Sequence, residues 1–416
     1  MEVPLKRMLR PFGLALALTT LAGCSQQSFM SPQTTQSLDM VLAQSNGLPA
    51  TVEIKIQDQK LVSAIEGTGA EILSVRMGSV DAAVTSQQAR DLKAKGFTLV
   101  PVQVGGSHYL DNTFDPAYHT YDEMLAKLKS LTAANPQIAK LVDIGETWEK
   151  TQGKADRDIW AVRLGTPGKT PVLFTGCTHA RELATVELPL MLIEHLIKGH
   201  GRDAKVTEWL ANRDIWIVPM LNPDGHARAA QGLDWRKNAN SSYGGAPMFG
   251  VDLNRNYGYQ WAGVGTSRDP KSPIFVGGAP FSEPETQAIK KLHDQFKFPV
   301  SLSYHSYSEL VLYPWAYTSQ PAPDQKRLQA IADKLAEAGK YDAHQSSQLY
   351  PHAGEHNDYV YHTHGTFGFT YEVGTRRDGF DPPYSRVADF WNETREGAEL
   401  MLEIADAPKT KALKVR

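Results

Sequence analysis

A short stretch of the sequence holds a histidine, His179, and three residues later a glutamate, Glu182. An imidazole and a carboxylate are side chains that bind metal ions. An apolar run at 171–174 precedes this stretch, and an apolar helical pattern at 185–197 follows it. A turn between a strand and a helix can aim both side chains at one point past the carboxyl end of the strand, where open α/β sheets bind ligands. One imidazole and one carboxylate supply two of the three protein ligands of a catalytic zinc site.

The spacing of His179 and Glu182 is weak by itself, because a chain with 13 histidines and 46 acidic residues produces it readily by chance. The best third ligand is His305, near the end of a strand-like apolar run, although a core histidine is the alternative. Cys177 is expected to be a small buried thiol and not a ligand. Because Cys24 is the only other cysteine, no disulfide framework is expected.

The first 24 residues predict an export signal. Three cationic residues are followed by an uncharged run at 11–22 that is too short to span a bilayer as a helix. The sequence Leu-Ala-Gly-Cys at 21–24 resembles the lipobox of bacterial lipoproteins, which would make Cys24 an acylated residue that holds the protein to a membrane of the cell envelope. The alternative is ordinary cleavage near the same point, which would leave a secreted protein.

Residues 25–48 are polar and are predicted to form a flexible tether. Residues 49–105 predict a small α+β module, with strand patterns at 51–56, 72–77, 80–84 and 97–104. Thr85 and Gln88 form a capping box for a helix between the third and fourth of these strands. The module has no metal or nucleophile pattern, so we interpret it as an accessory or propeptide-like domain, with a structural role and an inhibitory role both open.

Residues 113–405 predict a second, larger domain, and residues 406–416 a C-terminal tail. Thr120 and Glu123 cap its first helix, and Asn135-Pro136 ends that helix. Strand patterns then alternate with helical patterns, which predicts an α/β fold with a mixed, mostly parallel sheet and helices on both faces. The net charge of −3 and the lack of a basic stripe argue against nucleic acid as a partner, and a monomer is expected.

Loops rich in turn residues follow residue 221 and carry cationic side chains. Arg236 and Arg255, with Asp252 and Asn254 in the same region, suggest a receptor for an anion, although surface arginines usually face solvent. Glu372 ends an apolar strand pattern at 367–371, where a salt bridge is the alternative to a catalytic role. The histidines at 344–364 are interpreted as part of a polar loop, not as a second metal site.

Five motifs in this order resemble the zinc carboxypeptidases of the carboxypeptidase A, B and T kind. The resemblance covers about residues 115–405, and it keeps both the order and the approximate spacing of the family's motifs. The motifs are His179–Glu182, Asn222–Gly225 with Trp235–Lys237, Val251–Asn256, His305–Pro314 and Phe369–Val373.

The resemblance implies one Zn²⁺ per chain, held by His179, Glu182 and His305, with water in the open fourth position. It makes Glu372 the general base, which fits a carboxylate next to an activated water. Arg236 matches the arginine that polarises the scissile carbonyl and stabilises the oxyanion.

The resemblance also implies how a substrate is bound. Asn254 and Arg255 match the pair that binds a free C-terminal carboxylate, and Tyr350 matches the tyrosine that closes over the substrate. Arg181 and Tyr307 match residues of neighbouring peptide subsites. Asp252 would accept a hydrogen bond from His179 and fix its tautomer.

Asn357 falls where the family sets the floor of its specificity pocket. An amide carries no charge, and Ser303 and Ala316 at two other pocket positions are small and neutral. We therefore expect a broad preference for neutral C-terminal residues and weak acceptance of basic ones, unless Glu355 or Asp358 reaches the pocket.

Three functions agree with this sequence. The first is a zinc carboxypeptidase that releases C-terminal amino acids from peptides or proteins. The second is a peptidase of the same family that acts on the peptides of the cell wall. The third, a catalytically inactive peptide-binding lipoprotein, is disfavoured because His179, Glu182, His305 and Glu372 are all present.

Overall fold

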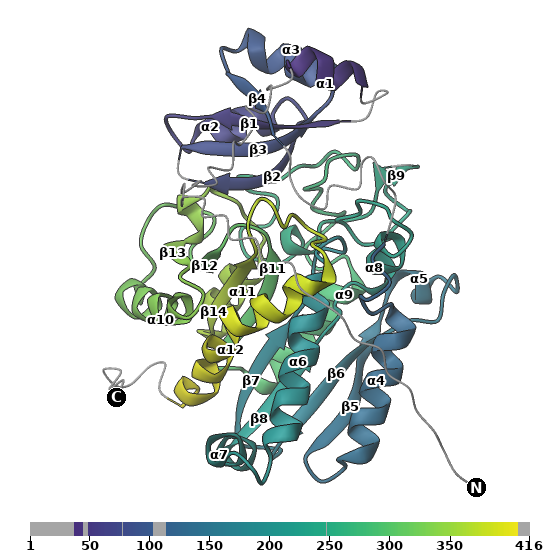
Figure 1. Cartoon of the computed structure of the whole chain (residues 1–416), viewed down its shortest axis with the longest axis vertical. Helices are drawn as coiled ribbons and strands as arrows, with labels where there is room; N and C mark the ends of the chain where they lie inside the picture. The colour runs from purple at the N-terminus through teal and green to yellow at the C-terminus, as the bar shows by residue number, and fades with distance from the viewer. Residues whose placement is uncertain (1–36, 45–48, 77, 103–113, 247, 407–416) are drawn as a thin grey trace, which may run out of the picture. The chain divides into compact units, whose positions relative to one another are not determined.

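The computed structural model describes residues 37–44, 49–76, 78–102, 114–246 and 248–406 (Figure 1). These residues belong to one compact unit that begins at Ser37. The predicted export signal, with Cys24, lies outside the described residues, as do residues 25–36 of the predicted tether and residues 407–416 of the predicted tail. The prediction that Cys24 is lipidated therefore stays a prediction.

The small module is an α+β unit built on a four-stranded antiparallel sheet with the strand order β2-β3-β1-β4. The Thr85 side chain accepts a hydrogen bond from the Gln88 amide and Gln88 returns one to Thr85, so the predicted capping box is confirmed. The strands are β1 (Ala50–Lys55), β2 (Glu71–Arg76), β3 (Ser79–Val84) and β4 (Leu99–Pro101), and the helices are α1 (Leu38–Gln44), α2 (Leu61–Glu66) and α3 (Ser86–Ala94).

Helix α1 lies within the segment that was predicted to be a flexible tether, so that prediction is wrong for residues 38–44. Leu38 and Leu42 are buried in the core of the module, with Val41 packed beside them. These three residues are spaced as one helical face in an otherwise polar segment. Such a short helix is marginal alone and gains its stability from packing, which local composition does not reveal.

The larger domain is built on an eight-stranded mixed sheet with the order β13-β12-β14-β11-β7-β8-β6-β5. The central strands β14, β11, β7 and β8 run parallel, whereas β12 is antiparallel to β14 and β6 is antiparallel to both β8 and β5. The strands are β5 (Ala139–Glu146), β6 (Asp158–Gly165), β7 (Thr170–Thr175), β8 (Arg213–Val218), β11 (Val300–Ser306), β12 (Leu310–Tyr313), β13 (Asp342–Gln345) and β14 (Phe367–Val373).

Helices cover both faces of this sheet, as predicted. Alternate residues of a strand point to opposite faces, and on β7 Val172 and Phe174 join one apolar cluster while Leu173 joins another. The first cluster holds helices α4 (Tyr121–Ala134), α6 (Ala184–Gly199), α7 (Ala204–Asn212), α10 (Gln325–Glu337) and α12 (Val387–Ile404); the second holds α9 (Pro284–Phe296) and part of α11 (His356–His364).

Short elements complete the domain and mostly shape its loops. They are α5 (Trp148–Thr151), α8 (Pro223–Ala229), β9 (Gly244–Gly245), β10 (Met248–Phe249) and the 3₁₀ turns η1 (Leu253–Arg255), η2 (Ser346–Gln348) and η3 (Tyr384–Arg386). The capping box predicted from Thr120 and Glu123 starts α4, and Asn135 ends it. Among the described residues, no helix has both the length and the hydrophobicity to cross a bilayer.

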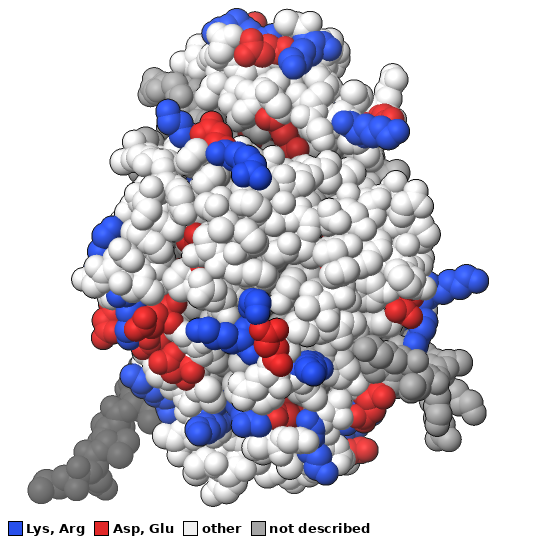
Figure 2. Space-filling view, turned by 180° about the vertical axis from the view of Figure 1, so that it is seen from behind, with Lys and Arg blue, Asp and Glu red and all other residues white. Residues whose placement is uncertain are grey.

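Charged side chains of both signs are interspersed on the face that Figure 2 shows. Some charged pairs of the described residues run along helices, for example Lys290 with Asp294 in α9. No extended field of one sign covers this face, which agrees with the near-neutral net charge of −3.

Helix α12 approaches strand β14 closely because Gly397 has no side chain. A Cβ atom at this position would lie 1.8 Å from the hydroxyl oxygen of Tyr371. That hydroxyl donates a hydrogen bond of 2.6 Å to the backbone oxygen of Leu335. The contact therefore holds β14, the strand that also carries Glu372, against two helices.

We expect Gly397→Ala to destabilise the protein, although alanine is the better helix former by about 1 kcal/mol. The added methyl overpacks the contact with Tyr371, at a cost of about 1–3 kcal/mol. Urea unfolding would measure the change. The double variant with Tyr371→Phe, which removes the clashing oxygen, should recover part of the loss, and a more stable Gly397→Ala protein would contradict this packing.

Candidate active site

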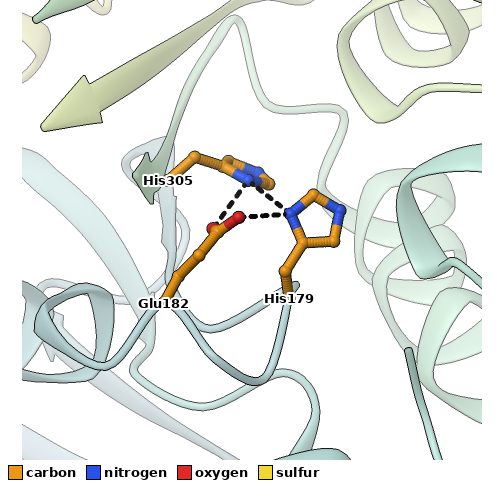
Figure 3. A group of neighbouring side chains, drawn as sticks. All are labelled: His179, Glu182 and His305. Carbon is orange, nitrogen blue, oxygen red and sulfur yellow. Dashed lines mark hydrogen bonds and ion pairs between the residues drawn. The ribbon is translucent and has the colours of Figure 1, made fainter. Parts of the chain in front are cut away.

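His179, Glu182 and His305 converge on one point, as Figure 3 shows. The first two lie in the turn between β7 and α6, and His305 lies in β11, which runs parallel to β7. His179 Nδ1 is 2.7 Å from Glu182 Oε1 and 3.1 Å from His305 Nδ1, and the latter is 3.1 Å from Glu182 Oε2. All three side chains are buried.

The donor set suits a metal cation. His179 Nε2 lies 3.2 Å from Asp252 Oδ1, and an ionised carboxylate can only accept, so Nε2 carries the proton. The lone pair of His179 Nδ1 then faces Glu182 and His305, an arrangement that is repulsive unless a cation lies between them. Two imidazole nitrogens and one carboxylate are a set that catalytic zinc uses, with the fourth position left for water.

Asp252 fixes the orientation of this site. Its carboxylate is fully buried. It accepts hydrogen bonds from Arg236 Nη2 at 2.9 Å and from the backbone N–H of Asn254 at 2.9 Å. Burial alone would raise the pKa of Asp252, but the charge of Arg236 and the hydrogen bond from His179 hold it well below its ordinary value. Asp252 therefore stays an anion that orients both a metal ligand and Arg236.

Glu372 lies beside the metal ligands because β14 pairs with β11 in parallel and places Glu372 opposite His305. It lines a cavity of about 90 Å³ together with His179, Glu182 and Arg236. Burial raises the pKa of Glu372 to about 7, and the charge of His305 acts in the opposite direction. Within the described residues no ion pair ties up this carboxylate, which favours the role of general base over that of a strand-end salt bridge.

Arg255, Asn254 and Tyr350 line the same cavity. The Arg255 guanidinium is 2% exposed and donates to the Tyr350 hydroxyl at 2.9 Å and to the Asn254 backbone oxygen at 2.8 Å. A buried, oriented guanidinium matches the planar geometry of a carboxylate. The structure thus brings together the residues that the sequence predicted for binding a terminal carboxylate.

Arg181 and Tyr307 both contact Phe380. The Arg181 guanidinium stacks on the Phe380 ring at 3.8 Å and pairs with Asp234 and with Glu71 of the small module. Tyr307 is buried and lines the cavity, with its ring 5.1 Å from that of Phe380. Arg181, by contrast, is not among the residues that line the cavity.

Asn357 does not line the cavity in which its role was predicted. Its side chain donates to Thr370 at 2.9 Å, and its oxygen lies 3.2 Å from His356 Nδ1. Glu355, two residues earlier, lines the cavity instead. The sequence offered no signal to choose between them, because the motif gives a spacing and not the direction of a side chain.

The interpretation of the histidines at 344–364 as part of a polar loop is wrong for His344, which lies in β13, and for His356, His362 and His364, which lie in α11. His356 begins helix α11, and both it and His352 are buried. Among the described residues, the group His179, Glu182 and His305 is the one arranged to hold a metal ion. Cys177 is a buried free thiol whose pKa is raised by burial, as the sequence predicted.

A buried His-Glu-His metal site with a second glutamate beside it, at the carboxyl edge of a mixed α/β sheet, defines a metal-dependent hydrolase. Residues 124–397 match the family model described as zinc carboxypeptidase. The chain belongs to this family, whose members are zinc-dependent peptide hydrolases.

Individual relatives agree with this assignment. The chain is 32% identical to carboxypeptidase A1 of Bos taurus over 305 residues, which covers 70% of this chain and 71% of the relative. It is 30% identical to carboxypeptidase B of Astacus astacus over 299 residues, 68% of this chain and 96% of that one. The crystal structure of carboxypeptidase A from Helicoverpa armigera has the same fold, with a TM-score of 0.74 at 23% identity over 88% of this chain and 99% of that one.

We expect His179→Ala to lose bound zinc and activity together, because it removes one of three protein ligands. Glu372→Gln is the matched control: it keeps the ligand set and the shape but cannot accept a proton, so kcat should fall about 100-fold or more while zinc stays near one per chain. Elemental analysis and peptide hydrolysis would measure both. A His179→Ala protein that is fully active without zinc would contradict the ligand assignment.

Proposed function

We propose that this zinc carboxypeptidase homologue is an exopeptidase: it hydrolyses the C-terminal peptide bond of peptides or proteins and releases the terminal amino acid. The observation that carries the proposal is the position of Arg255. Its buried guanidinium lines the same cavity as the metal ligands and Glu372, with Asn254 and Tyr350 beside it. A cation at this place selects peptides by their free carboxylate, since it loses its partner when none is present.

The residues of the cavity divide the reaction between them. Zinc, when bound, supplies the Lewis acidity that lowers the pKa of water and polarises the scissile carbonyl. Arg255 and Asn254 hold the substrate's terminal carboxylate, which fixes the position of the last peptide bond. Glu372, whose carboxylate lines the cavity beside the metal ligands, takes the proton of the attacking water and passes it to the leaving amine. Arg236, oriented by Asp252, donates hydrogen bonds to the oxyanion.

The peptides of the cell wall are the alternative substrate, and they would use the same residues. A lipidated Cys24 would hold the enzyme at the envelope, where such peptides occur. Incubating the zinc-loaded chain with mixed peptides and with muropeptides, and identifying the products by mass, separates the two functions. Release of single C-terminal amino acids from ordinary peptides supports the proposal, and turnover of muropeptides alone supports the alternative.

The small module restricts access to this cavity in our proposal, which favours its inhibitory role over a purely structural one. Residues 72–75 of the module line the cavity together with the catalytic side chains. Glu71 pairs with Arg181 at 2.6 Å. Glu66 is close enough to Arg255 for the cation to lower its pKa, although burial raises that pKa to about 7 overall.

An ion-pair network fastens the module to strand β14. Arg376, just past the end of β14, donates to Asp81 at 2.6 Å and to Glu53 at 3.1 Å. Asp81 is fully buried and also pairs with Arg76 of the module at 2.7 Å. Removing Arg376 would leave Asp81 with Arg76 as its cation and would take away the charge pairs that join the module to the end of β14.

We expect amidated peptides to be poor substrates, because they leave the buried Arg255 guanidinium without its partner at a cost of about 2–5 kcal/mol. Arg255→Ala should slow the hydrolysis of peptides with a free carboxylate and hardly change the slow hydrolysis of the matched amides. Measuring kcat/KM for both substrates with both proteins gives the comparison. Equal cleavage of acid and amide by the unchanged enzyme would indicate an endopeptidase.

We expect Arg376→Glu to raise kcat/KM of the full chain by about tenfold or more, since repulsion from Asp81 and Glu53 loosens the module over the cavity. Arg377→Glu makes the same charge change at an exposed neighbouring position and should leave the rate unchanged. Peptide hydrolysis and limited proteolysis would measure both effects. An Arg376→Glu protein with a loosened module and an unchanged rate would show that the role of the module is structural.

A further inference from the structure

One carboxylate of the cavity has no part in the chemistry described above. Of the three glutamates that line it, Glu182 is a metal ligand and Glu372 is the base, which leaves Glu355. Glu355 is 4% exposed, and its Oε1 atom has no hydrogen-bond partner within the described part of the chain. A buried anion without a full set of partners is costly, so this oxygen is positioned for a ligand.

Capping of helix α11 does not account for both oxygens of Glu355. The residue occupies the N-cap position, and hydrogen bonds from the Asp358 backbone and the Asn254 side chain act to lower its pKa, but its Oε1 atom has no partner within the described residues. A capping role also favours the shorter side chains Ser, Thr, Asp and Asn. The carboxylate instead lines the cavity, next to Asn254 and near the charge of Arg255.

The position next to Asn254 and Arg255 indicates which part of a substrate Glu355 meets. A C-terminal residue carries its carboxylate and its side chain on one Cα atom, so a side chain extends into the space beside its own carboxylate. The walls of the cavity include several apolar side chains, among them Leu312 and Leu349. Apolar walls and one anionic oxygen match a side chain with a methylene stem and a cationic head.

Neighbouring groups do not take this role. Asp358 does not line the cavity, and its oxygens accept from the backbone amides of Ala316 and Tyr317. Burial lowers the pKa of His352 to about 3 and that of His356 to about 4, so both imidazoles are neutral and cannot neutralise Glu355. Asn357 lies behind the cavity wall, as described above.

We propose that Glu355 is the specificity-determining residue of the enzyme, and that its carboxylate pairs with the cationic side chain of a C-terminal lysine or arginine. The proposal rests on the proposed carboxypeptidase function. A neutral C-terminal residue would leave Glu355 and the substrate carboxylate as two anions near one guanidinium, Arg255, whereas a cationic side chain gives each anion a partner. This replaces the preference for neutral residues that the sequence predicted from Asn357.

The test compares peptides that end in arginine with peptides that end in citrulline, which has nearly the same shape and no charge. With the full, zinc-loaded chain, kcat/KM should be about tenfold or more higher for arginine. Glu355→Gln should bring the two substrates within about threefold of each other and leave the citrulline peptide almost unchanged. Glu309→Gln, which removes an exposed charge outside the cavity, should keep the preference.

A wild-type enzyme that cleaves the citrulline peptide as well as the arginine peptide, or better, would overturn the proposal whether or not the variant folds. Zinc content and thermal unfolding of Glu355→Gln identify a folding defect, and an equal loss on both peptides in a folded variant would also overturn it. If no peptide is cleaved, the exopeptidase proposal fails, and calorimetry with free arginine and free citrulline still decides the role of Glu355. Tighter binding of arginine, lost in Glu355→Gln, supports it, and equal binding rejects it.

Discussion

The buried carboxylate of Asp252 is the interaction on which the rest of the site depends. It accepts from the ring of His179, from the guanidinium of Arg236 and from the amide of Asn254. His179 of the His-Glu-His group, the guanidinium of Arg236 and the loop that carries Asn254 therefore share one fixed anion. Moving that anion would displace all three groups at once, and a fully buried charge tolerates such a movement poorly because each lost partner leaves it unpaired.

The mixed sheet supplies the second constraint. Strands β7, β11 and β14 are parallel neighbours, so their carboxyl ends meet at one edge although they lie far apart in the sequence. His179 and Glu182 follow β7, while His305 and Glu372 lie in register on β11 and β14. Backbone hydrogen bonds thereby set the distance between the His-Glu-His group and Glu372. Close packing beneath, such as Gly397 against Tyr371, keeps the strand that carries Glu372 in place.

Much of this arrangement was predictable from the sequence, because local signals and global fold agree. Thr85 and Thr120 mark helix starts through capping boxes, and the spacing of five motifs pointed to four side chains that the fold brings together, His179, Glu182, His305 and Glu372. Two kinds of feature could not be predicted from the sequence. Helices α1 and α2 are short and depend on tertiary packing. The lining of the cavity near the start of α11 depends on the direction of each side chain, which changes from residue to residue along a helix. Glu355 lines the cavity and Asn357, two residues later, does not.

In the proposed inhibitory role of the module, the shared wall of the cavity would couple two equilibria, the docking of the module and the binding of a peptide. Residues 72–75 of the module and Tyr350 line the same space, and Tyr350 also packs against the apolar core of the module while its hydroxyl accepts from Arg255. If the docked module weakens peptide binding by some factor, a bound peptide must weaken the docking of the module by the same factor. This equality is a requirement of thermodynamic linkage. Substrate concentration would then set how much of the chain is open, and a saturating peptide would act as an activator of its own hydrolysis.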